Sequence, residues 1–182
     1  MAVLLIMSIK YLLAVPHLII LGVYTWIAGI AAWIAQWIVL FTGRYPAGFH
    51  AFVLGSLRWT WNVNAWLSGI VDKYPPFSAD ADRGYPATAT CDRAEKYSRG
   101  LAIARILAFP LAIILIPHFI ALGVLGLLWL IAFVMGPWAT ILTGGYSRLS
   151  YEIIVGVQRW QHRFSCYMLG LVDAYPPFRT WP

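Results

Sequence analysis

Charged residues are scarce in this 182-residue chain, which has only 13 Lys and Arg and 7 Asp and Glu, or 11% of its residues. A water-soluble domain carries about a quarter charged residues, so this chain lacks the polar surface that such a domain needs. Hydrophobic residues instead make up 61%. This composition excludes a soluble enzyme, a secreted disulfide scaffold and a disordered tail, and it predicts an integral membrane protein in a lipid bilayer.

Cysteines and the motifs of catalysis or metal binding are also scarce. Cys91 and Cys166 lie far apart in sequence in unlike surroundings, and we interpret them as free thiols. The sequence has no Ser-His-Asp order, His-Glu-x-x-His, Cys-x-x-Cys, Gly-x-Gly-x-x-Gly or phosphate-binding loop. We therefore expect no enzyme, no cofactor and no metal site. The net charge of +6 indicates contact with anionic lipids rather than with nucleic acid.

An internal repeat organises most of the chain. When the sequence is shifted by 101 positions, residues 16–77 align with residues 117–178 without a gap, and 22 of the 62 aligned residues are identical. Chance does not produce this similarity. The sequence therefore predicts a first membrane repeat over residues 1–77, a polar cytoplasmic linker over 78–100 and a second membrane repeat over 101–182.

Each repeat opens with an apolar stretch that is long enough to cross a membrane. The stretches 17–41 and 118–142 have 25 residues each and no formal charge, and such a helix extends about 37 Å. Shorter apolar pieces, 3–15 and 101–116, precede them. We interpret these pieces as interfacial helices or as extensions of the spans, bent at the intervening proline.

The second half of each repeat allows two interpretations. Residues 46–72 and 147–173 have a helical pattern but contain arginines, so each is either a second transmembrane helix or a helix on the membrane surface. With four spans, eight basic residues lie inside and two outside, which supports four spans with cytoplasmic termini. The predicted fold is all-α, with two tandem helical hairpins, parallel to each other, and about four transmembrane helices. The alternative is two antiparallel spans plus two amphipathic interfacial helices.

The Arg-Trp pairs are the first candidate site. An arginine near the middle of a spanning helix costs about 2.5–3.5 kcal/mol, which another interaction must offset. Arg58, Arg159 and Arg163 are therefore candidates for an anion or lipid-headgroup site, together with the neighbouring Trp59 and Trp160. The alternative is that each arginine reaches a headgroup or bonds loop carbonyls and so anchors its helix.

Two histidines occupy equivalent positions in the repeats. His17 and His118 lie at the starts of the predicted spans, where paired imidazoles are candidate ligands for haem or a chlorophyll-type pigment. The competing interpretation is a polar residue at helix entry. Because there is no second pair deeper in the bundle, we favour the second interpretation.

A Tyr-Pro-Pro-Phe motif closes both repeats. Consecutive prolines end the preceding helix and impose an extended exit. The motif therefore either stops the helix and anchors it through its aromatic rings, or forms a rigid docking edge for a partner. Its residues are Tyr74, Pro75, Pro76 and Phe77 in the first repeat and Tyr175, Pro176, Pro177 and Phe178 in the second.

The chain resembles a family of small bacterial membrane proteins known only as a domain of unknown function. The resemblance covers about residues 10–178 and is carried by Pro-His-Leu-Ile, Thr-Gly-Arg-Tyr-Pro, Gly-x-x-Arg-Trp and Val-Asp-Lys-Tyr-Pro-Pro-Phe-Ser. Asn62 stands where a second Arg is common, while the copy keeps Arg163. The resemblance implies a multispan protein of the bacterial cytoplasmic membrane, with no activity to carry over.

We expect a non-catalytic membrane subunit or scaffold that packs against other integral membrane proteins, or against a second copy of itself. The alternative is a small transporter or channel component in which Arg58 and Arg159 line an anion or lipid-headgroup path.

Overall fold

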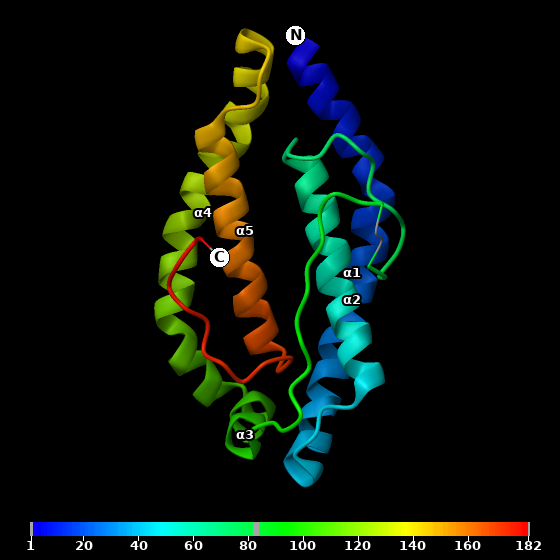
Figure 1. Cartoon of the computed structure of the whole chain (residues 1–182), viewed down its shortest axis with the longest axis vertical. Coiled ribbons are helices and arrows are strands. Elements are labelled where there is room, and N and C mark those ends of the chain that lie inside the picture. Colours follow the sequence, from blue (N-terminus) through cyan, green and yellow to red (C-terminus); the bar gives the residue numbers. More distant parts are fainter. Residues whose placement is uncertain (1, 82–83, 182) are drawn as a thin grey trace.

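The computed structural model describes residues 2–81 and 84–181, and this part of the chain is helical with no strand. The prediction of an all-α fold is confirmed. The five helices, coloured along the chain in Figure 1, are α1 (Ala2–Thr42), α2 (Ala47–Leu67), α3 (Arg99–Leu107), α4 (Phe109–Thr143) and α5 (Arg148–Met168).

The two long helices arise from the two longest apolar runs. α1 runs through Pro16 without a break, so the apolar piece before this proline extends the first helix. In the second unit the break falls at Ala108, which has a φ of 59°, and not at Pro117, which lies inside α4. α3 is therefore a separate short helix.

Two helices, not four, are long and apolar enough to cross a membrane. These segments are Ile9–Thr42 and Phe109–Thr143. The prediction of four spans is wrong, because α2 and α5 contain too many polar and charged side chains in 21 residues each. The number of candidate spans therefore agrees with the alternative of two spans, while the placement of α2 and α5 as amphipathic interfacial helices stays a prediction.

The two units are antiparallel. In Figure 1, α1 descends from the N-terminus while α4 ascends, with α2 and α5 between them. The contacts agree: the Tyr11 ring lies 6.5 Å from the Phe133 ring near the end of α4, whereas Trp33 donates a 3.4 Å hydrogen bond to the Ile106 carbonyl before α4 begins. The prediction of parallel halves is therefore wrong, because it depended on an even number of spans in each unit.

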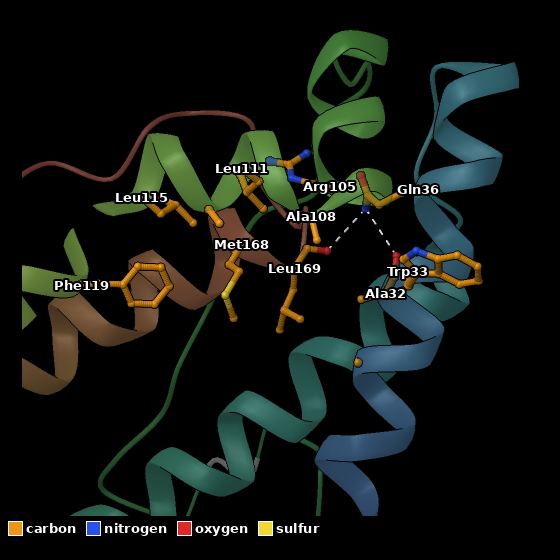
Figure 2. Close-up of a pocket in the computed structure, with 12 residues that line it drawn as sticks. Ala32, Trp33, Gln36, Arg105, Ala108, Leu111, Leu115, Phe119, Met168 and Leu169 are labelled. Atoms are coloured by element: carbon orange, nitrogen blue, oxygen red, sulfur yellow. Dashed lines mark hydrogen bonds between the residues drawn. The ribbon is translucent and has the colours of Figure 1, made fainter. Parts of the chain in front are cut away.

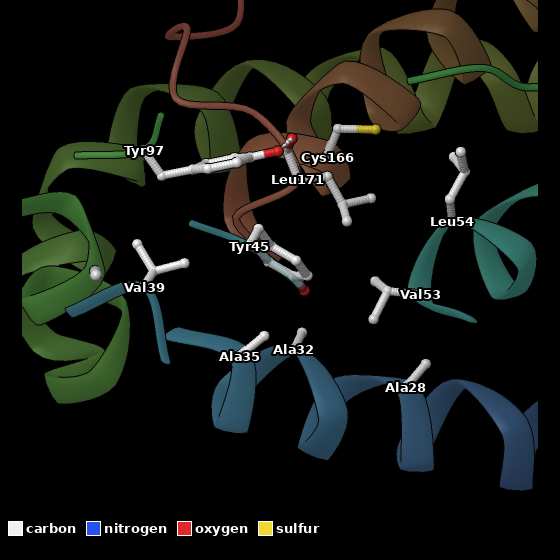
Figure 3. Packing of buried hydrophobic residues seen from close by; sticks show 11 residues of the cluster. Ala28, Ala32, Ala35, Val39, Tyr45, Val53, Leu54, Tyr97, Cys166 and Leu171 are labelled. Atoms are coloured by element: carbon white, nitrogen blue, oxygen red, sulfur yellow. Dashed lines mark hydrogen bonds between the residues drawn. The ribbon is translucent and has the colours of Figure 1, made fainter. Parts of the chain in front are cut away.

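The largest core cluster packs α1 against α2 of its own unit and against residues of the second unit. One face of α1 carries small side chains at helical spacing, which allow α2 and the segment after α5 to approach closely. Figure 3 shows this packing. The buried residues of the cluster are Ala28, Ala32, Ala35, Val39, Tyr45, Val53, Leu54, Tyr97, Ala102, Cys166 and Leu171.

The linker between α2 and α3 has no regular secondary structure in its described part. Figure 1 shows it passing between α2 and α5 on its way to α3. Its end is fixed where the Tyr97 amide donates to the Gly43 carbonyl at 2.9 Å and the Ser98 side chain caps α3. The predicted polar linker, 78–100, thus includes the first two residues of α3, which begins at Arg99.

Candidate functional site

Residues from three separate motifs of the first unit form an aromatic cluster around His17. This histidine of α1 is fully buried, and its Nδ1 accepts a 2.9 Å hydrogen bond from Nε1 of Trp59 on α2. Phe77 stacks on the imidazole with a centroid distance of 3.8 Å. The Tyr74 hydroxyl donates to the Leu13 carbonyl at 2.9 Å. The cluster therefore holds the segment after α2 against the side of α1.

The second unit repeats this cluster at positions 101 residues later. Nε1 of Trp160 donates to Nδ1 of His118 at 3.2 Å, and Phe178 stacks on the imidazole at 4.0 Å. The Tyr175 hydroxyl donates to the Ile114 carbonyl at 3.2 Å. Three motifs that are separate in sequence thus meet twice in space. Their shared role is to fasten an irregular segment to a helix pair.

The two histidines do not meet each other. Each lies in a cluster made by residues of its own unit, where a tryptophan occupies Nδ1 and a phenylalanine covers one ring face. Nε2 of His17 and of His118 is buried without a hydrogen-bond partner. This geometry favours a structural role for each imidazole.

The tyrosine and phenylalanine rings of both Tyr-Pro-Pro-Phe motifs are partly exposed. Tyr74 and Phe77 are 40% and 52% exposed, and Tyr175 and Phe178 are 43% and 50% exposed. Partner docking through these outer faces stays a prediction, while the inner faces serve the clusters described above.

The equivalent arginines of the two units have different surroundings. Arg58 donates to the carbonyls of Ala79 at 3.0 Å and Ala89 at 3.2 Å, so it joins α2 to the segments that follow it. This geometry favours an anchoring role for Arg58. Arg159 is exposed and makes no hydrogen bond or ion pair within the described residues. The two arginines line different cavities.

A cluster of thiols and imidazoles, which the sequence did not reveal, lies where the linker meets α5. Cys166 Sγ is 3.5 Å from Nε2 of His162, and this nitrogen is 3.0 Å from the Thr90 carbonyl oxygen. Cys91 of the linker lies beside Cys166 and beside His50 of α2. Both cysteines are free. Within residues 2–81 and 84–181, no group of three His, Cys, Asp or Glu side chains is arranged to hold a metal ion.

The two thiols have opposite pKa shifts. The hydrogen bond from Cys166, followed by one from His50, lowers the pKa of Cys91 to about 5. The same contact with Cys91, together with burial, raises the pKa of Cys166 above its usual range. Cys91 is therefore the nucleophilic thiol of the pair at neutral pH.

Another cavity, lined mostly by apolar side chains, lies where α1, α4 and the end of α5 meet. Its volume is about 310 Å³, and Figure 2 shows Leu111, Leu115 and Phe119 on one side and Gln36 on another. At its edge the buried Arg105 forms a 2.8 Å ion pair with Asp173. Because the Arg105 guanidinium also bonds two carbonyls, it joins α3 to the segment after α5. Arg105 is a structural residue that the sequence did not single out.

The comparison with known families concerns the first unit. Residues 7–79 match the model described as Domain of unknown function (DUF4389). The matched stretch includes α1, α2 and the first Tyr-Pro-Pro-Phe motif, so it covers the whole His17 cluster. No curated protein and no solved structure matches the chain.

Proposed function

We propose that the protein is a non-catalytic membrane subunit or scaffold of a larger assembly, in the bacterial cytoplasmic membrane. The observation that supports this proposal is the apolar surface of α1 and α4. Large hydrophobic side chains are exposed along both helices, from Ile9 to Phe41 and from Phe109 to Leu142. Such a surface requires lipid or other apolar helices around it.

The contacts between helices support a particular orientation in the membrane, because charged groups accompany α1 along its length. Lys10 donates to the Trp66 carbonyl near the start of α1. Asp80 lies near Tyr24 in the middle, and Arg99 bonds the Phe41 carbonyl at the end. Along α1, the longest stretch between two of these charged contacts runs from residue 24 to residue 41 and corresponds to about 26 Å of helix. It is shorter than the hydrocarbon core of about 30 Å.

The same argument applies to α4. The ion pair between Arg148 and Glu152 is solvent-exposed. It falls between two contacts with α4, one from Tyr146, just before α5, to Gly136 and one from Trp160 of α5 to His118. If α4 stood across the bilayer, this pair would lie near mid-depth, where charges and irregular segments are unfavourable. We therefore infer that α1 and α4 lie along the membrane, with their apolar faces in one leaflet.

The assembly can be tested by size. The protein is extracted from its native membrane in a mild detergent and analysed by native electrophoresis and mass spectrometry. A scaffold is expected to migrate in a complex far above its own 20.4 kDa, with other membrane proteins in fixed ratio. A monomer from native membranes, or a homodimer that conducts anions after reconstitution, would contradict the proposal and favour the transporter alternative.

A further inference from the structure

A cavity between the two units has a polar wall made by α5. Its volume is about 510 Å³, and it is bounded by α2, α5 and linker residues 86–90. The polar side chains on the α5 wall include Gln158, Arg159, His162 and Arg163. Among the described residues, those that line the cavity include no Asp or Glu. The cavity therefore has a positive wall without a lining carboxylate to balance it.

Two hydrogen-bond donors at this wall have no acceptor. Gln158 is only 4% exposed, and its Nε2 is buried without a hydrogen-bond partner. Nε of Arg163 is buried without a partner as well. Both atoms donate only, and burying a donor without an acceptor is unfavourable. An acceptor inside the cavity would satisfy both.

The positive charges around Arg163 favour the same kind of ligand. Burial and the positive charges of Arg179 and Arg159 lower the pKa of Arg163. Arg163 also donates to the Arg179 carbonyl, which keeps these like charges close together. A negatively charged ligand would offset both the mutual repulsion and the burial.

We propose that this cavity binds a phosphate-type oxyanion, with Gln158, Arg159 and Arg163 as its donors. An oxyanion of this kind presents several acceptor oxygens in different directions, which suits an amide and two guanidinium groups that approach separately. Arg159 is available for this contact because no carbonyl or carboxylate of the described chain occupies it.

The first unit explains why the chain holds one such site. At the positions equivalent to Arg159 and Arg163 it has Arg58 and Asn62. Arg58 is already bonded to the Ala79 and Ala89 carbonyls, and Asn62 supplies no charge. The two units therefore share an arginine at this helix position, but within the described residues only Arg159 of the second unit is left without a protein acceptor.

The test uses the purified, delipidated full chain in a neutral detergent. Native mass spectrometry measures lipid retention from an equal mixture of phosphatidylglycerol and phosphatidylcholine, and thermal unfolding is followed with inorganic phosphate or with chloride at equal ionic strength. The variants are Arg159→Gln, which alters an exposed residue, and Gln158→Met, which removes the donor without changing the charge. Arg44→Gln is the matched control, since Arg44 is exposed and lies outside the cavity. Circular dichroism checks that each variant folds.

We expect one retained phosphatidylglycerol per chain in the wild type and in Arg44→Gln, and about tenfold less retention in the two cavity variants. This result supports a lipid headgroup as the ligand. If phosphatidylglycerol is not preferred but inorganic phosphate raises the unfolding temperature of the wild type and control alone, the ligand is a free phosphate. The absence of both effects, or equal effects in all variants, would overturn the proposal. The size of the native assembly does not enter this test.

Discussion

Cys91 allows a prediction that depends on one side chain. Its pKa is lowered to about 5 by hydrogen bonds from Cys166 and His50 and by the nearby His162, so at neutral pH the thiolate is the main form. We expect iodoacetamide to modify Cys91 and to leave the buried Cys166 largely unmodified. The rate should change little between pH 6 and pH 8, as measured by mass spectrometry of peptides from the folded protein.

The Cys91→Ser variant serves as the control, since it removes the reactive thiol and retains Cys166. An ordinary thiol with its pKa above 8 would react about ten times faster for each pH unit over this range, because its thiolate fraction rises in that proportion. A slope of this kind in the wild type would show that the contacts of Cys91 do not stabilise its thiolate.

Single residues differ in how far the sequence revealed their roles. His17 and Trp59 were identifiable because the repeat preserves them, although their hydrogen bond was not. Cys91 and Cys166 were not identifiable as a pair, since Cys91 lies in the linker outside both units and Cys166 has Ala65 at its equivalent position. The two thiols meet only through the path of the linker. Repetition in the sequence therefore identified residues of the histidine clusters, but it gave no signal for the cysteine pair, which occurs only once.

The hydrogen bond between Trp59 and His17 allows a prediction about how α2 is held on α1. Trp59→Phe retains most of the buried ring but removes the indole N–H that donates to Nδ1 of the fully buried His17 imidazole. Leaving a buried acceptor unpaired costs about 1–3 kcal/mol. We therefore expect the unfolding temperature in detergent to fall by several degrees, because about 2–4 °C is lost per kcal/mol at this chain length.

Trp26→Phe is the matched control, because Trp26 also lies on α1 but its side chain is 70% exposed. It should leave the unfolding temperature unchanged within about one degree, since surface substitutions of this kind usually change stability by less than 0.5 kcal/mol. Equal effects of Trp59→Phe and Trp26→Phe would show that the hydrogen bond does not stabilise the helix pair.

Helix existence followed from the sequence, whereas helix orientation did not. The apolar runs 17–41 and 118–142 lie inside α1 and α4, as predicted. The error concerned α2 and α5. A polar helix that only packs against a long apolar helix and a polar helix that itself crosses the membrane beside one have similar amino-acid compositions. Counting basic residues cannot separate these cases, since the count assigns sides only after the number of spans is assumed.

The antiparallel arrangement of the whole molecule has a physical consequence for its membrane contact. The apolar sides of α1 and α4 remain exposed although the two helices run in opposite directions. If both helices lie along one leaflet, the two units meet the same lipid surface in the same way, and no charged segment crosses the hydrocarbon. A pair of upright helices would instead place the linker and the exposed ion pair of α5 inside it.

This orientation is tested by measuring depth along the molecule. Single cysteines replace Leu12, Val23, Phe41 or Leu127, which are 71%, 59%, 74% and 65% exposed, in a background in which the native cysteines are serine. Each variant is spin-labelled in vesicles, and its depth is measured from accessibility to oxygen and to a water-soluble nickel complex. We expect all four labels at similar shallow depth, about 5–10 Å below the headgroups. In an upright helix, residues 12 and 41 would be about 43 Å apart along the axis. A deep label at Val23 between two shallow labels at Leu12 and Phe41 would therefore contradict the orientation along the leaflet.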